Sequence, residues 1–448
     1  MPTYFFILGR NPELSLAELH ALLPVKYALR AFSREAAIVE CAELEVETLM
    51  RRLGGTIKMG EILQACHFDQ ASGASARRNL TPLLLEVVGS LDCARDDEKR
   101  KKLFLGLSAY ALNNTAKLPS VRELRNLGIE IKRALQTPSS SPPSQGGEKR
   151  SVRLVTSKEI ALSSVIVKKE KLLTRGAEIV LFYGAKIESL ISNLSARGGS
   201  ASGGQYPIVG KTLAVQEFEE ASARDFGRPA REMKVGLLPL QLAKIMINLA
   251  RAPLDATILD PFCGFGTVLM EASQMGYTNL IGTDLEQKMV DATRKNLEWL
   301  QAKFTVNSSQ STAKLITAPV EQLSKHLPPR SVDAIVTEPY LGPTRETRDS
   351  RFEIRDLVDL YINAFREFAK ILKPNARVVF IMPSFKSGAT LTKTSAHVLP
   401  EIKKLRFQPI PLLPNNLITQ SLNNSVSITY SRPDQRVLRE IFVFEYKK

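Results

Sequence analysis

Acidic, glycine and aromatic residues that could do chemistry follow three apolar runs in the second half of this 448-residue chain. The first run leads into "LDPFCGFGTV" (259–268), the second into "GTDLE" (282–286) and the third into "VTEPYLGP" (336–343). Each run is typical of a buried strand, and in open α/β sheets ligands bind beyond the carboxyl ends of the strands. We therefore expect the three segments to lie together at one ligand site.

The first two segments have the composition of a nucleotide-like pocket. Gly264 and Gly266 allow a tight turn that a ligand can approach closely, and Asp284 is placed to accept hydrogen bonds from a ribose diol. Neither the third glycine of the dinucleotide pattern nor the GK[ST] of a phosphate-binding loop is present. Asp260 would repel a pyrophosphate but suits a cationic ligand, so the residues indicate S-adenosylmethionine rather than NAD.

The third segment supplies what methylation of an exocyclic base amine requires. The lone pair of such an amine is delocalised into the ring, and a carboxylate that accepts the N–H bonds, here Glu338, frees it. An aromatic ring stacked on the base, here Tyr340, holds it in line and contributes ~1–3 kcal/mol per base. Pro339 stiffens the turn between them. A general base is the alternative role for Glu338.

Composition limits the classes of partner. A net charge of +15 and a pI of about 9.6 favour nucleic acid, although a generally basic solvated surface would give the same balance. The four cysteines and four histidines are dispersed and have no metal-site spacing, so we expect no metal. No run approaches ~20 apolar residues, which predicts a cytosolic protein without a membrane segment.

The elements that position the three segments begin at residue 232. Strand-like runs such as "ATILD", "NLIGTD", "SVDAIV" and "ARVVFIM" alternate with helical patterns. This alternation predicts a doubly wound, mostly parallel α/β sheet over 232–448, with an antiparallel hairpin in the tail at one sheet edge. A Gly/Ser-rich stretch at 195–204 predicts a linker over 196–231.

The first part of the chain reads as two small α+β modules, over 1–68 and 69–195. In the first, Ser15 and Glu18 fit a capping box at the start of a helix, and the strand–helix alternation suggests a ferredoxin-like unit. The second contains a Pro/Ser/Gly-rich stretch at 137–148 and a helix capped by Ser120. It also carries basic residues typical of a phosphate-backbone contact, or of a solvated helix face: Lys158, Lys168, Lys169, Lys171 and Arg175.

These motifs resemble those of the class I, Rossmann-like S-adenosylmethionine-dependent RNA methylases, specifically the THUMP-bearing tRNA guanosine-N2 methyltransferases. "GTDLE" is similar to their second motif, which implies cofactor contacts for Asp284 and Leu285. "RDFGRPAREMKVGLLPLQLAKIMINLA" and "DQRVLREIFVFEY" resemble the stretch before the first motif and the C-terminal end. The resemblance covers 210–448 well and 1–195 more loosely, where it implies ferredoxin-like and THUMP-like modules that bind tRNA. "DPFCGFG" matches the first motif through Asp260, Phe262, Cys263, Gly264 and Gly266.

The fourth motif departs from the family's T-D-P-P-Y-G or N-P-P-Y. Aligning Thr337 with the family Thr puts Glu338 in the Asp position, whereas aligning Pro339 and Tyr340 with the final Pro-Tyr puts Thr337 there. In both alignments we expect Glu338 to be the polar acceptor and Tyr340 the stacking ring.

We therefore predict a monomeric S-adenosylmethionine-dependent enzyme that methylates guanine N2 in tRNA, with a small protein activator as a further partner. A DNA amine methyltransferase is one alternative, and the RNA-binding character of the first modules argues against it. An RNA-binding protein with a decayed active site is another. The altered "TEPYLG" favours that reading, and the intact cofactor motifs oppose it.

Overall fold

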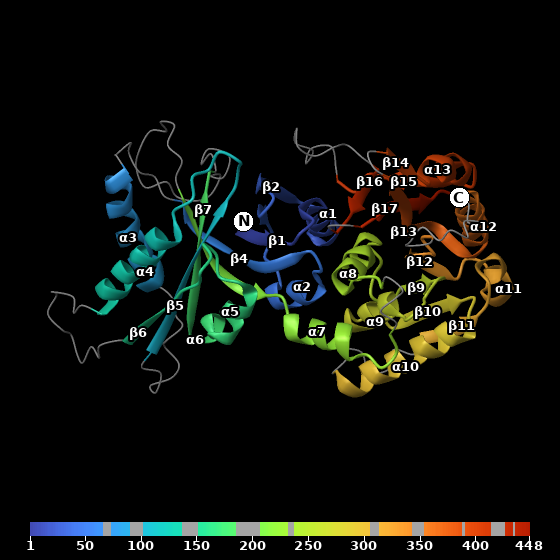
Figure 1. Cartoon of the computed structure of the whole chain (residues 1–448), viewed down its shortest axis with the longest axis horizontal. Coiled ribbons are helices and arrows are strands. Elements are labelled where there is room, and N and C mark those ends of the chain that lie inside the picture. Colours follow the sequence, from blue (N-terminus) through green and yellow to red (C-terminus); the bar gives the residue numbers. More distant parts are fainter. Residues whose placement is uncertain are drawn as a thin grey trace. The chain divides into compact units, whose positions relative to one another are not determined.

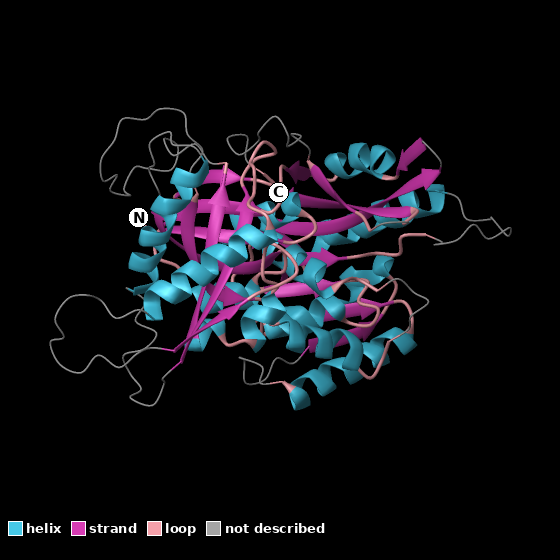
Figure 2. Cartoon of the chain, turned by 60° about the vertical axis from the view of Figure 1, so that its left-hand side comes forward, coloured by secondary structure: helices cyan, strands magenta, loops and turns pink. Residues whose placement is uncertain are grey.

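A computed structural model describes residues 1–65, 73–89, 102–136, 151–184, 207–231, 237–304, 313–342, 354–387, 390–413, 426–432 and 435–448. The stretches 137–148 and 195–204 lie outside the described residues. The chain forms two units, each with its own β-sheet flanked by helices (Figures 1 and 2). The first unit comprises Met1–Pro12, Leu23–Arg51 and Thr56–Glu217, and the second comprises Glu13–Leu22, Arg52–Gly55 and Phe218–Lys448.

The sheet of the first unit has the strand order β2-β3-β1-β4-β8-β7-β5-β6. Strand β8 pairs antiparallel with both β4 and β7, so it joins the strands of the two predicted modules into one sheet. Strands β1 to β4 alternate with α1 (Pro12–Leu22) and α2 (Val46–Arg52) in the βαββαβ order of a ferredoxin-like unit. The strands are β1 Thr3–Leu8, β2 Tyr27–Phe32, β3 Ala36–Cys41, β4 Thr56–Ala65, β5 Lys102–Ala111, β6 Ser151–Val155, β7 Gly176–Tyr183 and β8 Ile208–Val215.

Helices cover both faces of this sheet because successive strand residues alternate between the faces. Helices α3 (Gly73–Gly89) and α4 (Val121–Gln136) pack on the face that carries Leu105. The short helices α5 (Ser164–Lys169) and α6 (Leu172–Arg175) pack on the face that carries Phe104. The predicted cap of α4 is confirmed, since Ser120 Oγ accepts a hydrogen bond from Glu123 N at 3.2 Å.

A buried ion pair connects four strands of the first unit. Glu178 of β7 is fully buried, and its Oε1 lies 2.5 Å from Lys58 Nζ of β4. The hydroxyl groups of Ser108 on β5 and Thr212 on β8 donate to the same carboxylate at 2.5 and 2.7 Å. Both carboxylate oxygens thus have donors, which is the condition under which a buried charge is tolerated.

The sheet of the second unit has the order β11-β10-β9-β12-β13-β17-β15, with β14 paired to β13 and β16 to β17. The pairs β10–β11, β9–β10, β9–β12 and β12–β13 are parallel, whereas β13 pairs antiparallel with β14 and β17. Because β9 pairs with both β10 and β12, the strand order reverses at β9 and makes a topological switch point. The strands are β9 Thr257–Asp260, β10 Asn279–Asp284, β11 Ala313–Thr317, β12 Val332–Thr337, β13 Leu372–Ser387, β14 Thr390–Lys393, β15 Phe407–Ile410, β16 Ser427–Tyr430 and β17 Val437–Tyr446.

An aromatic core holds helices to this sheet. Phe365 of α12 lies 5.1 Å from the ring of Phe380 on β13 and 5.3 Å from that of Phe444 on β17, measured between ring centroids. The helices are α7 Phe218–Gly227, α8 Leu240–Leu249, α9 Thr267–Gln274, α10 Gln287–Lys303, α11 Leu323–His326, α12 Ile354–Ile371 and α13 Ser395–Lys404, with a 3₁₀ turn at Val320–Gln322.

Most of α1 belongs to the second unit, where buried Glu18 holds it. The Glu18 carboxylate accepts hydrogen bonds from Gly54 N and Gly55 N, both at 2.8 Å, and from Asn248 Nδ2 of α8 at 2.7 Å. The predicted capping box is therefore wrong. Helix α1 begins at Pro12, and Ser15 Oγ donates to Gly55 O at 2.7 Å.

Two other sequence expectations differ from the structure. The segment 196–231, predicted to be a linker, contains β8 and α7 in its described part. The tail forms the predicted hairpin of β16 and β17, but β17 is not an edge strand because β15 and β16 pair along its outer side. Strands β11 and β15 and helix α13 were not predicted.

Candidate functional site

Three strand ends meet at the carboxyl edge of the second sheet. Strand β9 ends at Asp260, β10 at Asp284 and β12 at Thr337. Thr337 Oγ1 donates a hydrogen bond of 2.6 Å to Asp260 Oδ1, and Gly264 N of the glycine turn donates one of 2.9 Å to Asp284 Oδ2. The three chemistry-bearing segments therefore lie together, as their positions after apolar strands predicted.

Asp260 is a buried carboxyl at the centre of this arrangement. Its side chain is only 2% exposed, and its Oδ1 also accepts a hydrogen bond from Phe262 N at 3.2 Å. Burial raises the pKa of Asp260 to about 7, and the carboxylates of Asp284 and Glu338 add to the rise, against the two hydrogen bonds. The group thus titrates close to neutral pH, where a nearby cation would favour its ionised form.

The glycine turn is open on one side and tightly packed on the other. Gly264 and Gly266 both have left-handed backbone conformations, with φ of +49° and +78°. A Cβ at Gly264 would meet no atom of the described residues within 4 Å, whereas one at Gly266 would lie 2.8 Å from Thr293 Cγ2 of α10. Gly264 therefore leaves space for a ligand against the backbone, and Gly266 allows the turn to pack on α10.

Neighbouring side chains fix the turn from behind. Thr293 Oγ1 donates to Gly264 O at 2.8 Å, and Asn296 Nδ2 donates to Phe265 O at 2.9 Å. Cys263 is buried, and burial raises the pKa of its thiol, so it packs as a small neutral side chain. Phe262 is partly buried against the hydrophobic core.

Asp284 is partly exposed and binds backbone groups on both sides of the site. Besides Gly264 N, its carboxylate accepts a hydrogen bond from Glu286 N at 3.0 Å. Each oxygen retains a further acceptor site, because an ionised carboxylate offers about four in all. The adjacent Leu285 is 70% exposed, so an apolar surface lies beside the acid.

Glu338 has an ion-pair partner that the sequence did not reveal. Arg439 of β17 donates from Nε to Glu338 Oε1 at 2.5 Å and from Nη2 to Oε2 at 3.5 Å. The two side chains are 13% and 7% exposed. Burial raises the pKa of Glu338, and Arg439 opposes that rise. The predicted acceptor is therefore held in a fixed direction by a guanidinium group from a distant strand.

Tyr340 follows at the surface of the same turn. The residue is 55% exposed, and its carbonyl oxygen accepts a hydrogen bond of 2.6 Å from Tyr361 Oη of α12. Pro339 is buried between the acid and the ring, and Gly342 has a φ of +89°. The turn is thus anchored through its backbone, with Tyr340 at the surface of the unit.

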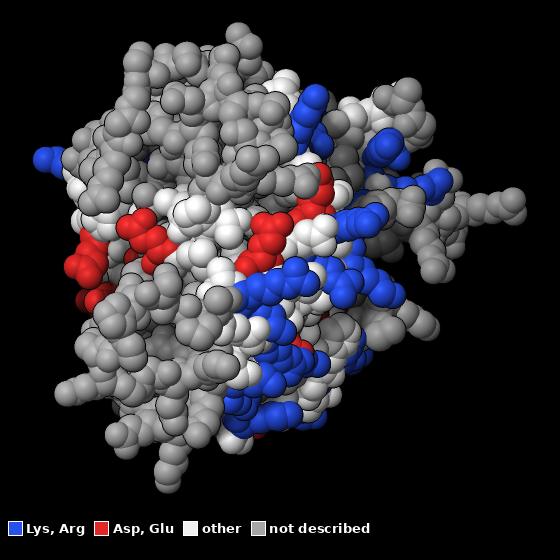
Figure 3. Space-filling model, turned by 90° about the vertical axis from the view of Figure 1, so that its left-hand side faces the viewer, with Lys and Arg blue, Asp and Glu red and all other residues white. Residues whose placement is uncertain are grey.

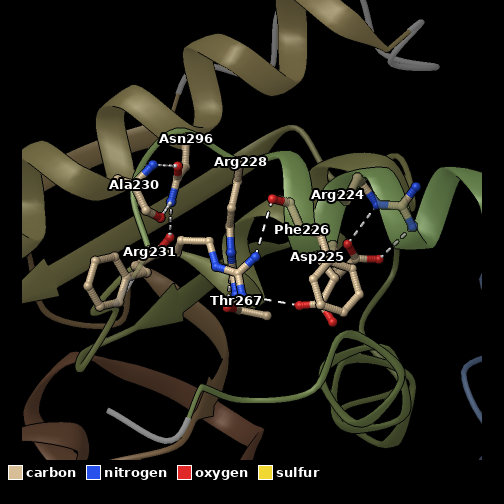
Figure 4. A network of polar contacts seen from close by, with 10 residues as sticks. Arg224, Asp225, Phe226, Arg228, Ala230, Arg231, Thr267 and Asn296 are labelled. Atoms are coloured by element: carbon tan, nitrogen blue, oxygen red, sulfur yellow. Dashed lines mark hydrogen bonds and ion pairs between the residues drawn. The ribbon is translucent and has the colours of Figure 1, made fainter. Parts of the chain in front are cut away.

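Residues 224–231, which we call the strap, contact α9 and α10, the two helices that pack beside the glycine turn (Figure 4). Arg224 donates to both Glu271 oxygens of α9 at 2.8 and 3.1 Å. Arg228 Nη1 donates to Thr267 Oγ1 at 2.8 Å, and the backbone of Ala230 exchanges two hydrogen bonds of 2.9 Å with the Asn296 side chain. The strap falls in the segment predicted to be a linker, and its site role was not predicted.

Comparison with known proteins agrees with this geometry. Residues 228–404 match the family described as UPF0020, RMKL-like, methyltransferase domain. The chain is also 31% identical over 140 residues to a probable tRNA (guanine(10)-N2)-dimethyltransferase of Methanothermococcus thermolithotrophicus, covering 31% of this chain and 78% of that relative. The chain belongs to the RMKL-like methyltransferase family. This RMKL-like methyltransferase carries its family match on residues 228–231 of the strap and on strands β9 to β14 of the second sheet.

Other relatives share a shorter part of their length with this RMKL-like methyltransferase. It is 32% identical over 182 residues to the tRNA (guanine(10)-N2)-dimethyltransferase of Methanocaldococcus jannaschii, or 39% of this chain and 48% of that one. For the Pyrococcus abyssi enzyme of the same name the identity is 30% over 168 residues, 37% of this chain and 44% of the relative. The matches thus span about half the length of these relatives.

A solved structure shows the same fold over the whole RMKL-like methyltransferase. TrmN from Thermus thermophilus aligns over 100% of both chains with a TM-score of 0.50 and 16% sequence identity. The second unit is accordingly a Rossmann-like methyltransferase fold, as the alternating strands and helices predicted. In the described part of the chain, no helix is long and apolar enough to span a membrane.

The predicted RNA-binding residues of the RMKL-like methyltransferase differ in their surroundings. Lys168 forms an ion pair with Glu217, and the Arg175 guanidinium lies 4.9 Å from the ring centre of Phe104. These two side chains therefore also serve the fold of the first unit. The remaining three are exposed: Lys158, Lys169 and Lys171. On the face drawn in Figure 3, Lys and Arg side chains gather in a continuous band.

Proposed function

We propose that this RMKL-like methyltransferase transfers a methyl group from S-adenosylmethionine to the exocyclic N2 amine of a guanine in tRNA. The observation that carries the proposal is the hydrogen bond between Thr337 and Asp260. It joins the "TEPYLG" turn to the glycine turn, so a base at one and a cofactor at the other would be neighbours. The names of the relatives, which specify guanine N2 in tRNA, support the choice of amine and RNA.

The residues at the glycine turn fit S-adenosylmethionine. The open side of Gly264 admits a ligand, and Asp284 has acceptor sites left for a ribose diol. Asp260 supplies negative charge for the cationic methionine portion, and Leu285 supplies an exposed apolar side chain for the adenine. When bound, S-adenosylmethionine supplies an electrophilic methyl group.

The "TEPYLG" turn prepares the base. Glu338 accepts the N–H bonds of the guanine amine, and Arg439 keeps that carboxylate ionised and aimed. The exposed ring of Tyr340 stacks on the base, which must first be extruded from any helix it occupies. Positioning of this kind supplies much of the rate when the reacting partners are both held.

The first unit would hold the rest of the tRNA through its ferredoxin-like and THUMP-like modules. Lys158, Lys169 and Lys171 are exposed and could contact phosphates. A protein that uses backbone contacts in this way selects RNA by shape, and leaves the base itself to the second unit.

Methylation of an unmodified tRNA transcript with labelled S-adenosylmethionine tests the proposal. We expect label in N2-methylguanosine or N2,N2-dimethylguanosine after digestion and mass spectrometry. Tyr340→Phe should retain most of the rate because stacking survives, whereas Tyr340→Ala should not. Label in duplex DNA and none in tRNA would identify a DNA amine methyltransferase. Tight tRNA binding without methylation of any substrate would identify an RNA-binding protein with a decayed site.

A further inference from the structure

Arg228 of the strap is a buried cation with unused hydrogen-bonding capacity. Its side chain is only 2% exposed, and Nη1 donates to Thr267 Oγ1 at 2.8 Å. Nε and Nη2 are both buried and have no hydrogen-bond acceptor among the residues that the structure describes. The nearest carboxylate oxygen, Asp225 Oδ1, is 3.7 Å from Nη2, beyond hydrogen-bond distance. Buried guanidinium donors are ordinarily satisfied, so these two point to a ligand.

The two atoms form the edge of a guanidinium that binds carboxylates. Nε and Nη2 lie on the same side of the group, and their parallel N–H bonds match the two oxygens of a carboxylate. Arg224 with Glu271 and Arg439 with Glu338 show this edge on both oxygens of a carboxylate. Arg228 presents the same edge, and within the described part of the chain no carboxylate lies at hydrogen-bond distance from it.

The location of Arg228 limits which ligand can reach it. Thr267, its partner, is the first residue of α9 and follows Gly266 directly, so the guanidinium lies at the amino end of that helix beside the glycine turn (Figure 4). The helix amino end adds its own attraction for an anion. The residue is only 2% exposed, which favours the terminal carboxylate of a small molecule over a phosphate within a tRNA backbone. Arg228 donates to the residue that directly follows Gly266, so a small molecule bound at the glycine turn would bring such a group toward this edge.

We propose that the Nε and Nη2 edge of Arg228 binds the carboxylate of the methionine portion of S-adenosylmethionine. This inference rests on the proposed function, since it assigns one group of the same cofactor to one residue. Each charged group of the methionine portion then faces a side chain of opposite charge, the carboxylate at Arg228 and the ammonium group toward Asp260. The strap is then a part of the cofactor site as well as a support for the glycine turn.

Calorimetry with two ligands tests the assignment. S-adenosylmethionine carries the carboxylate, and decarboxylated S-adenosylmethionine lacks it but keeps the sulfonium, the ribose and the adenine. The full-length wild-type protein should bind the first about 10- to 100-fold more tightly, the range expected for a charge-assisted bidentate contact. Arg228→Gln should lose most of that preference by weakening only the binding of S-adenosylmethionine. Arg228→Lys should keep part of the preference, because it retains the charge without the fork.

Asp225→Asn is the matched control, since it removes the partner at 3.7 Å and leaves Arg228 in place. It should bind both ligands as the wild type does. Equal affinity of the wild type for the two ligands would overturn the inference without any variant, even if Arg228→Gln failed to fold. An equal loss for both ligands in Arg228→Gln, or the same loss in Asp225→Asn, would show that Arg228 only supports the turn. A wild type that binds neither ligand would overturn the proposed function as well.

Discussion

From the ion pair between Glu338 and Arg439 we predict both the rate of methyl transfer and its pH dependence. If Glu338 accepts the amine N–H bonds as a carboxylate, Glu338→Gln should slow methyl transfer roughly 10²–10⁴-fold, because the charge is lost while an acceptor remains. Arg439→Gln acts differently. Burial raises the pKa of Glu338 and Arg439 opposes the rise, so removing the guanidinium raises that pKa further. The acid limb of the rate profile should then move to higher pH.

Arg439→Gln should also change the stability of the protein, and this change must be separated from the change in rate. Both side chains are largely buried, at 13% and 7% exposed, so removing one partner leaves the other poorly solvated. For a buried pair this lowers the free energy of unfolding by roughly 3–5 kcal/mol. Arg439→Gln should therefore be less stable than the wild type, and rates must be measured below its unfolding transition.

Single-turnover methylation of a tRNA transcript across pH, with each variant saturated with S-adenosylmethionine, is the assay. The double variant Glu338→Gln/Arg439→Gln should be about as slow as Glu338→Gln alone, because Arg439 acts through Glu338. Arg439→Lys should keep part of the wild-type rate and should move the acid limb to higher pH by less than Arg439→Gln does. If Arg439→Gln retained the wild-type profile, or if the two losses multiplied in the double variant, the positioning role of Arg439 would be refuted.

Three further predictions follow from the described contacts. Asp260 has a pKa of about 7 in the folded chain against an ordinary 3.8, so its contribution to stability is present below pH 3.8 and lost as pH rises through 7. Asp260→Asn should remove this loss of roughly 4 kcal/mol, which urea unfolding at several pH values would measure. Lys58→Met should lower the free energy of unfolding by roughly 3–5 kcal/mol by leaving Glu178 unpaired, and Lys58→Met/Glu178→Gln should recover part of it; no recovery would argue against a charge effect. Three exposed lysines can be neutralised together, Lys158, Lys169 and Lys171. The slope of log K for tRNA binding against log salt concentration should then become shallower by about 0.7–0.9 per lost phosphate contact, whereas Lys403→Gln, as control, should leave it unchanged.

The strand ends of the site could be predicted because each depends on local pattern. An apolar run followed by Asp260, Asp284 or Thr337 indicates a buried strand and its carboxyl end, and parallel strands place such ends together. The glycine turn could be predicted for the same reason, because its residues are adjacent in the sequence. The charge partner of Glu338 could not be predicted, since Arg439 lies on β17, which reaches β12 only through β13. Pairing across a sheet of this kind leaves no trace in the spacing of either motif.

The predictions that failed did so where tertiary contacts override local signals. Ser15 and Glu18 have the spacing of a capping box, but their side chains bind the backbone at Gly55 and Gly54. Strand β8 follows a Gly/Ser-rich stretch, which suggested a linker, yet it is stabilised by pairing with β4 and β7. The strap was missed for a similar reason, because Arg224 and Arg228 gain their roles from acceptors on α9.

The assignment of α1 to the second unit has a consequence for how this protein could be divided or recombined. The backbone changes unit at 12/13, 22/23, 51/52, 55/56 and 217/218. A gene fragment starting at Phe218 would encode the family match but omit Glu13–Leu22 and Arg52–Gly55, and would leave Asn248 without the Glu18 carboxylate that it binds. The second unit therefore cannot be isolated as one continuous segment of the chain. If the first unit is exchanged between homologues, the recipient must keep its own α1 and its own 52–55 turn.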